Sequence, residues 1–241
     1  MADRVGRITW DDVGNRKYET GTDRGVLYLF GSANAPYANG VGWDGLTGIS
    51  LAPSGAEATD LWADNIKYLT MRSAEQLGFT INAYQSPKEF DECDGSASIA
   101  PGVNIGQQKR KAFGLSYRTI IGNDTELDDY GYKIHLIYGA TAAPSQREYK
   151  TVNNSPEAMN PSWTCSTNPV NVPGFKPTAH IEIDSTKVDA AKLKTLEDIL
   201  YGTDAVEADP ENGIEAKPAT APRLPLPEEV MKIFRTEVIG G

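Results

Sequence analysis

Apolar and polar side chains alternate residue by residue in several short segments of this chain. The clearest examples are residues 78–85, 115–122, 132–139 and 179–185. A period of two places successive side chains on opposite faces of an extended strand, so each segment predicts a strand with one face on a core. No long helical pattern separates these strands, which favours antiparallel sheets in a sandwich or barrel.

Two further segments extend the predicted sheets. Residues 24–31 are apolar on both faces, which is typical of a strand that runs through a core, and residues 66–75 are another strand candidate. Helices are few. Residues 189–202 form the best helical pattern, with Asp189 as N-cap and Gly202 as stop. The sequence therefore predicts a mainly β fold with one or two flanking α-helices.

A glycine-rich segment, residues 31–65, matches neither pattern and is predicted to be a long inter-strand loop. A loop of this length inside a compact domain is usually functional. The large apolar side chains within it and at its edge need something to pack against, and we expect them at contacts between subunits. These candidate interface residues are Phe30, Tyr37, Trp43, Leu51 and Trp62.

The composition changes after Asp204. Residues 205–241 are rich in Pro, Ala and Glu and are predicted to form an extended C-terminal arm, separate from a β domain over residues 1–204. Near its end, Ile233 and Phe234 share a helical face with other apolar residues, so they join the candidate interface. An apolar patch at the end of an arm indicates docking elsewhere.

The formal net charge is −10, and Cys93 and Cys165 are the only cysteines. An acidic chain has little affinity for nucleic acid, because that affinity comes from Lys and Arg at the phosphates. Two distant cysteines make neither a disulfide framework nor a zinc site. No apolar run is long enough for a transmembrane helix and the first residues lack a signal-peptide core, so we expect synthesis and folding in a cytosol.

The segment EFDECDG places Glu89, Asp91, Glu92 and Asp94 close together, within residues 86–95, which carry helix start and stop signals. Three interpretations stay open: a solvated surface helix, which such clusters usually are, a subunit contact, or a metal site. The spacing does not match an EF-hand loop.

His135 and His180 are the only histidines, and each lies in a predicted strand. The sequence contains no serine-nucleophile, zinc-protease, P-loop or dinucleotide-binding motif. We therefore expect no catalytic, cofactor-binding or metal-binding residues, and the chain is predicted not to be an enzyme.

Three long segments follow one another in a fixed order: ASIAPGVNIGQQKRKAFGLSYRTIIGNDT, YKIHLIYGATAAPSQREYKTVNNSPEA and SWTCSTNPVNVPGFKPTAHIEIDSTK. Together they resemble the major tail protein, or tail tube protein, of long-tailed bacteriophages that infect Gram-positive bacteria. The similarity runs from about residue 24 to residue 203 and excludes the arm. It implies an antiparallel β-sandwich of the tail-tube type, with residues 86–93 as a flanking helix.

The same resemblance implies a structural role in the virion. Six copies would form a ring, their inner sheets would join into one β-barrel, and stacked rings would form the tube through which the genome passes. Residues 31–65 would reach the neighbouring ring. The partners would be further copies of the chain and other tail proteins, such as the tape measure and the tail terminator. Assembly would take place in the bacterial host cytoplasm, with no membrane involved.

A genome conduit must not bind DNA tightly, and acidic walls repel phosphates. Glu182 and Asp184 alternate with Ile181 and Ile183, so these two acids are candidates for the lumen wall.

Two other hypotheses stay open. A β-sandwich module that binds surface carbohydrate would be monomeric, with exposed aromatic residues on one rigid face. A hydrolase with one carboxylate pair would need a concave pocket holding two acids at a fixed separation.

Overall fold

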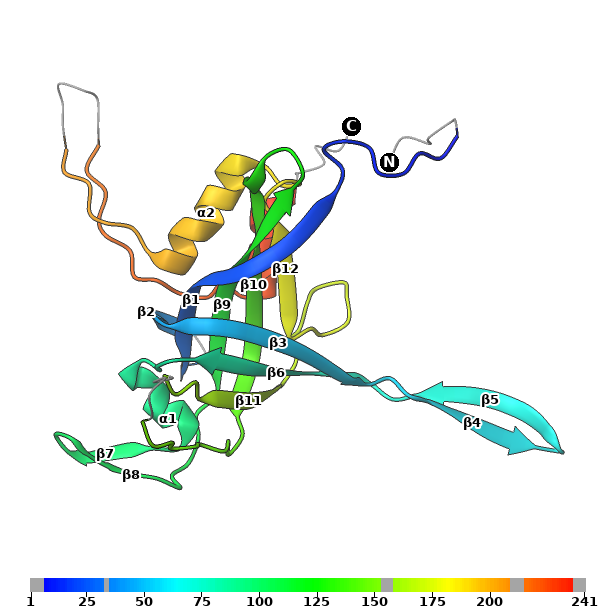
Figure 1. Ribbon diagram of the computed structural model, residues 1–241, viewed down its shortest axis with the longest axis horizontal. Coiled ribbons are helices and arrows are strands. Elements are labelled where there is room, and N and C mark those ends of the chain that lie inside the picture. The colour runs from blue at the N-terminus through cyan, green and yellow to red at the C-terminus, as the bar shows by residue number, and fades with distance from the viewer. Residues whose placement is uncertain (1–6, 33–34, 153–157, 209–214, 236–241) are drawn as a thin grey trace.

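The predicted fold class is confirmed: the protein is mainly β, with antiparallel sheets and few helices. The computed structural model describes residues 7–32, 35–152, 158–208 and 215–235 (Figure 1). The strands are β1 (Lys17–Ser32), β2 (Ala35–Gly42), β3 (Leu46–Gly55), β4 (Ala58–Ala63), β5 (Ile66–Arg72), β6 (Glu75–Ala83), β7 (Ala97–Ala100), β8 (Val103–Ile105), β9 (Phe113–Asn123), β10 (Leu127–Ala142), β11 (Ser162–Thr167) and β12 (His180–Asp184). The helices are α1 (Asp91–Asp94), which follows a 3-10 turn (Lys88–Phe90), α2 (Ala190–Tyr201) and α3 (Pro227–Phe234).

Eight strands form one sheet that folds over into two layers. Hydrogen-bonded neighbours follow the order β2-β1-β9-β10-β11-β6-β3, and β12 pairs with β10 off this path. One layer contains β1, β9, β10 and β12, and the other contains β3, β6 and β11, whose strands run across those of the first layer in Figure 1. The two hairpins β4–β5 and β7–β8 form small sheets of their own.

Strand β10 belongs to both layers because it bends near Gly139. Its pairing with β9 shifts register between Ile137 and Ala140, and Gly139 has a φ of +59°. A Cβ atom at Gly139 would lie 2.2 Å from the carbonyl oxygen of Asn168. Glycine is therefore needed at this bulge, which redirects the strand from β12 toward β11.

The inner core lies between the two layers. Its centre is an aromatic cluster of Trp43, Phe90, Phe113 and Trp163, whose contacting rings have centroids 4.7–5.7 Å apart in tilted or edge-on pairs. These are favourable geometries for aromatic rings. The cluster holds the short helical segment that carries Phe90 against both layers of the sheet.

The outer core lies on the opposite face of the first layer, under α2 and α3. Leu193, Leu196 and Leu200 of α2 are buried there against the strands. Strand β1 serves both cores, since Leu27 is in the inner core and Tyr28 in the outer one. This arrangement confirms the prediction that residues 24–31 form a strand apolar on both faces.

Helix α2 begins as the sequence predicts. The side chain of Asp189 accepts hydrogen bonds from the backbone N–H groups of Ala191 and Lys192 at 3.0 and 3.1 Å. These bonds satisfy two of the free donors at the helix start.

The prediction of a separate C-terminal arm is wrong for the part of it that ends in α3. Isolated bridges pair Thr203 with Thr220 and Val206 with Lys217, and after them the chain returns to the body. Leu224 and Val230 are buried in the outer core, and Ile233 and Phe234 pack against it. Composition indicated an extended segment, but it could not show that the apolar residues near the end dock on the chain's own sheet.

The prediction of a loop over residues 31–65 is also wrong in its secondary structure, since β2, β3 and β4 occupy most of that range. Its glycines indicated a loop, but some of them lie inside strands and others serve turns and strand ends. Gly45, at φ +76°, lies in the turn between β2 and β3, and Gly55, at φ +84°, ends β3. Glycine adopts these left-handed conformations without strain.

Candidate functional site

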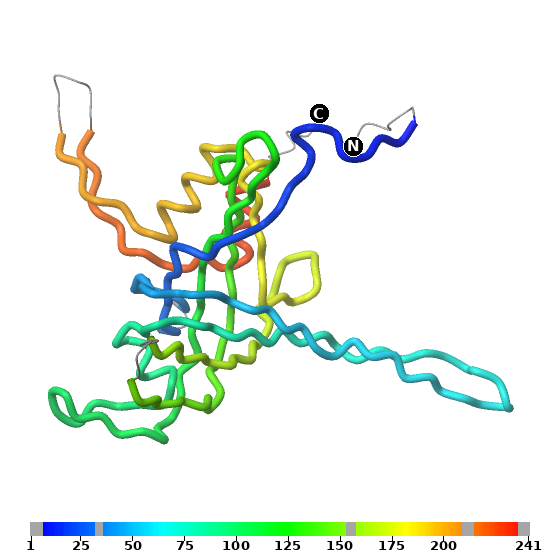
Figure 2. The backbone as a smooth tube through the Cα atoms, in the orientation of Figure 1, coloured from blue at the N-terminus to red at the C-terminus, as the bar shows by residue number. Residues whose placement is uncertain are grey.

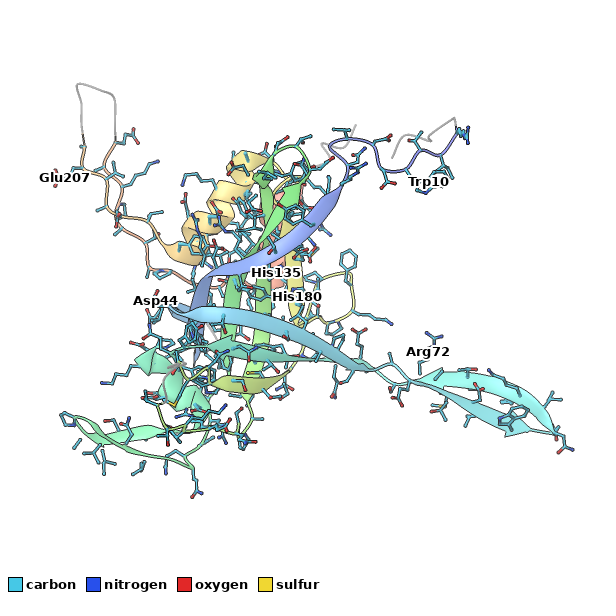
Figure 3. The ribbon with its side chains drawn as sticks, in the orientation of Figure 1. Trp10, Asp44, Arg72, His135, His180 and Glu207 are labelled. Carbon is cyan, nitrogen blue, oxygen red and sulfur yellow. The ribbon has the colours of Figure 1, made fainter. Side chains whose placement is uncertain are left out.

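A hairpin far from both cores carries a concentrated set of exposed apolar side chains. Strands β3 and β6 stay paired as far as Gly55 and Glu75, and β4 and β5 continue as a ribbon to Ala63 and Ile66 at the tip. Figures 1 and 2 show this ribbon extending well beyond the sandwich, with Arg72 near its base in Figure 3. Every residue of β4 and β5 is exposed.

The hairpin has a defined conformation although all residues of its two strands are exposed. Its tip is a two-residue turn at Asp64 and Asn65, both with positive φ, which is the turn that suits the twist of a hairpin. Lys67 forms an ion pair of 2.8 Å with Asp60 across the strands. The exposed large apolar residues of this hairpin are Leu61, Trp62, Ile66, Tyr68, Leu69 and Met71.

A two-stranded ribbon is only marginally stable in water by itself. Large contiguous patches of exposed apolar groups usually mark sites where a protein contacts another molecule. The hairpin is therefore the strongest candidate in the described chain for a surface that another molecule covers.

The predicted interface residues divide into two groups. Trp62 is 68% exposed on the hairpin, and Leu51 is exposed on the part of β3 that leads to it. Phe30 is 47% exposed and contacts the edge of Tyr37, with ring centroids 5.5 Å apart. These three remain available to a partner.

The interface prediction is wrong for Tyr37 and Trp43, each only 3% exposed. The Trp43 ring belongs to the aromatic cluster, and its Nε1–H donates to the carbonyl oxygen of Gln85 at 2.9 Å. The Tyr37 hydroxyl accepts a hydrogen bond from the N–H of Gly139 at 2.8 Å. Both rings fill their own chain's cores, because the segment that carries them is strand rather than loop.

The two candidate lumen acids lie on β12 and differ in their surroundings. Glu182 is exposed and pairs with Lys133 at 3.1 Å. Asp184 pairs with Lys187 at 2.6 Å and accepts hydrogen bonds from Thr186. Burial raises the pKa of Asp184, but these partners together hold it below its usual value. Asp184 thus closes the turn after β12.

A stack of three rings crosses the first layer on the same face as Glu182. His135 lies between Tyr117 and His180, with centroid distances of 4.6 and 5.3 Å and nearly parallel planes. The side chain of His135 is buried, and Figure 3 labels both histidines at the middle of the sheet. The sequence places each histidine in a strand, but it does not reveal this stack.

The hydrogen bonds around the stack fix where its protons lie. Thr119 donates its hydroxyl hydrogen to Glu19 at 2.6 Å, so the Thr119 oxygen accepts from Nε2 of His135 at 3.0 Å. The Nδ1 atom of His135 is then an acceptor, and Nε2–H of His180 donates to it at 3.1 Å. The chain of donors runs from His180 to Glu19 across four strands.

This arrangement disfavours a charged His135. Burial, and next the neighbouring His180, lower the pKa of His135 to about 4, although Glu182 and Glu19 oppose the shift. Burial also lowers the pKa of His180. A second proton on His135 would need the Nδ1 site that already accepts from His180, so the neutral form is built into the hydrogen bonding.

The acidic segment at residues 89–94 forms a short helical turn that is anchored on one side and charged on the other. Phe90 and Cys93 are buried in the inner core. Glu92 pairs with Lys111, and Asp94 pairs with Arg147. The predicted charged outer helix is therefore short, and its buried side holds it to the sandwich.

Among the residues that the structure describes, no three His, Cys, Asp or Glu side chains gather in a way that could hold a metal ion. In the same residues, no helix is both long enough and apolar enough to span a membrane. Comparison with known proteins yields neither a matching family model nor a matching curated protein.

Sequence reasoning placed a strand over residues 66–75, which β5 confirms, but it missed the partner strand β4 and the hairpin that the two form. Asp64 and Asn65 are residue types that tolerate the positive φ of a tight turn, and they separate two short segments rich in apolar residues. For the ring stack no single segment carries a signal, because it depends on the register that places His135 opposite Tyr117.

Proposed function

We propose that this chain is a structural subunit of a bacteriophage tail tube, which forms six-membered rings that stack into a conduit for genome ejection. The observation that carries the proposal is the projecting β4–β5 hairpin, whose apolar side chains are left uncovered in a single copy. Strand β4 and the turn of the hairpin lie within residues 31–65, the segment that the resemblance assigns to contacts with the neighbouring ring, and β5 follows directly after it. Covering it with another copy would remove these groups from water.

The edges of the sheet support self-association. Strands β2 and β3 stand at the two ends of the strand order, so each has one side without a hydrogen-bonded strand of this sheet. Such edges can pair with a strand of another molecule, and joining edges around a ring would produce a continuous barrel. Phe30 lies opposite Tyr37 in the β1–β2 pairing and would stand beside such a junction.

The charge of the chain agrees with a passage for DNA. A net charge of −10 gives little affinity for phosphate, so DNA would pass without specific binding. The side chain of Glu182 is exposed, which supports it as a lumen residue, while Asp184 is engaged in its turn. In the virion, the tape measure and the tail terminator would be the remaining partners, and assembly would take place in the host cytoplasm.

Negative-stain electron microscopy of the concentrated protein, beside light scattering at low concentration, tests the proposal. We expect rings or striated tubes with six-fold end views. The variant Trp62→Ala should need at least about tenfold more protein to assemble, as expected when a central aromatic contact is lost. Phe175→Ala is the matched control, because Phe175 is an exposed aromatic residue outside the hairpin.

A compact monomer at every concentration, with or without other tail proteins, would refute the tube proposal. That outcome would favour the carbohydrate-binding module, which glycan binding to exposed aromatic residues would then test. Equal assembly of Trp62→Ala and the wild type would show that the hairpin is not the contact surface.

A further inference from the structure

Strand β12 has an open edge. It pairs with β10 on one side, in a register that places Glu182 opposite His135. On its other side it has no strand partner among the residues that the structure describes (Figure 1). Unpaired backbone donors and acceptors along such an edge can bond to a further strand. The sheet can therefore be extended at β12.

The hydrogen bonds at the two ends of β12 show which of its backbone groups face the open edge. The N–H of Tyr138 donates to the carbonyl of Ala179 at 2.9 Å, and the N–H of Ser185 donates to the carbonyl of Tyr132 at 3.0 Å. The odd-numbered residues therefore bond to β10. Because the bonding alternates along an antiparallel ladder, the even-numbered residues direct their N–H and C=O groups to the open edge. These are His180, Glu182 and Asp184.

Nearby groups satisfy the ends of the open edge but not its centre. The hydroxyl of Thr178 donates to the carbonyl of His180 at 2.9 Å. The N–H of Lys187 donates to the carbonyl of Asp184 at 3.1 Å. The N–H and C=O of Glu182 receive no such contact from any residue that the structure describes. An added strand would therefore bond to the backbone of Glu182 through both groups.

An apolar groove of about 340 Å³ lies beside this edge, between β12 and α3. Its lining includes Ile181 and Ile183 of β12 and Val230, Met231 and Phe234 of α3. In β-strand addition, backbone hydrogen bonds to an edge hold the added strand and adjacent pockets take every second side chain. The open edge and the groove together form a site for an extended segment with apolar side chains.

The chain leaves α3 at this site. Helix α3 ends at Phe234, and Arg235 has extended backbone angles, with φ −60° and ψ 124°. The ammonium group of Lys192 donates to the carbonyl oxygens of Phe234 and Arg235 at 3.4 and 3.3 Å, which holds this exit beside the start of α2. Val188, between β12 and α2, also lines the groove. The exit thus lies near the C-terminal end of β12, and a segment that continues along β12 would run antiparallel to it.

Residues 236–241, which lie outside the described residues, have a suitable sequence and length. They include Thr236, Val238 and Ile239, which are residue types that favour strands. Six extended residues span at most about 20 Å. Glu182 lies two residues before the end of β12, which is about 7 Å along the strand. The segment is therefore long enough to turn at the end of α3 and to reach Glu182.

We propose that residues 236–241 pair with the open edge of β12 in their own chain and place Val238 or Ile239 in the β12–α3 groove. The same chain is favoured because the segment is tethered at the groove, which gives it a high effective concentration there. Such pairing would also cover an edge that could otherwise join a strand of another molecule. The inference concerns one chain, so it does not rest on the proposed assembly.

Amide hydrogen exchange, resolved to single residues by mass spectrometry, tests the pairing. The full chain is compared with a chain that ends at Arg235, at concentrations where light scattering shows monomers. We expect the Glu182 amide to exchange at least about tenfold more slowly in the full chain, because a bonded N–H exchanges only after the pairing opens. The Ile183 amide, which faces β10, should stay protected in both chains and reports that β12 is folded.

Substitutions on the two sides of the contact test its apolar part. The double substitution Val238→Asp with Ile239→Asp should remove the protection of the Glu182 amide, because charged side chains are not accommodated in an apolar groove. Met231→Glu should do the same from the side of α3. Met159→Glu is the matched control, since Met159 is exposed and lies outside the groove.

Three results would overturn the proposal. One is equal exchange of the Glu182 amide in the full and shortened chains while the Ile183 amide stays protected in both. Another is protection that survives both the double substitution and Met231→Glu. The third is protection that grows with protein concentration, which would assign the edge to a strand of another copy. Since the measurement needs no tubes, it can fail while tubes form, or succeed while they do not.

Discussion

Acid should destabilise this protein through His135, well before its carboxylates are protonated. The folded state holds the pKa of His135 at about 4, whereas an unfolded histidine has the ordinary value of 6.5. Between pH 6.5 and pH 4, His135 is therefore protonated in the unfolded chain but stays neutral in the folded chain. The stability that comes from keeping His135 neutral is fully present above pH 6.5 and is lost as the pH falls toward 4.

The size of the effect follows from the two pKa values. Their difference corresponds to about 3 kcal/mol once the pH is below both, and about 2 kcal/mol of this should be lost between pH 7.5 and 5. His180 adds to the loss, since its pKa is also lowered. The ion-paired carboxylates, such as Asp23 beside Arg118, lose their stabilisation only at lower pH, because the partner holds the pKa of Asp23 down.

The perturbation is His135→Gln. A glutamine amide can donate to Thr119 and accept from His180 as the imidazole does, but it does not titrate in this range. The variant should be less stable at pH 7.5, because it loses the stack on Tyr117, and its stability should fall less between pH 7.5 and 5. Urea unfolding at several pH values, followed by tryptophan fluorescence at concentrations without assembly, measures both quantities.

Parallel losses in wild type and variant over this range would refute the assignment to His135. So would a wild type that gains stability as the pH falls, because the sign of the linkage would then be reversed.

Three further substitutions test the packing. Phe90→Ala, at the centre of the aromatic cluster and 1% exposed, should cost about 3–5 kcal/mol in urea unfolding, and a loss below about 1 kcal/mol would contradict the core assignment. Gly139→Ala should cost at least about 2 kcal/mol, since it combines a left-handed backbone with a clash at Asn168; a neutral result would show that β10 does not bend there. Asp189→Ala should cost about 1 kcal/mol and Asp189→Asn much less; equal losses would exclude a capping role.

Several elements of this fold were predictable because their signals are local. The alternation in residues 115–122 and 132–139 identifies strands β9 and β10, and the cap at Asp189 identifies the start of α2. The apolar run at residues 24–31 identifies a strand between two cores. Each of these depends only on side chains a few positions apart.

The remaining features depend on contacts between distant residues. The burial of Trp43 follows from the rings of Phe90 and Trp163, which come from other parts of the chain. Helix α3 docks on an apolar surface that β12 and α2 form together, and these two elements come from other parts of the chain. For the candidate surface, composition identified Trp62 as needing a partner, but only the pairing of β4 with β5 shows that it projects on a ribbon.

The position of β1 between the two cores has a consequence for how the molecule unfolds. Leu27 is enclosed by one core and Tyr28 by the other, where its hydroxyl donates to the carbonyl of Leu200 in α2 at 2.9 Å. Because both cores pack on β1, disrupting either core exposes part of this strand and weakens the other core. The sandwich and the helices that cover it should therefore unfold as one cooperative unit. Amide hydrogens around residues 26–28 should therefore exchange only through global opening, while those of the β4–β5 hairpin exchange through local fraying.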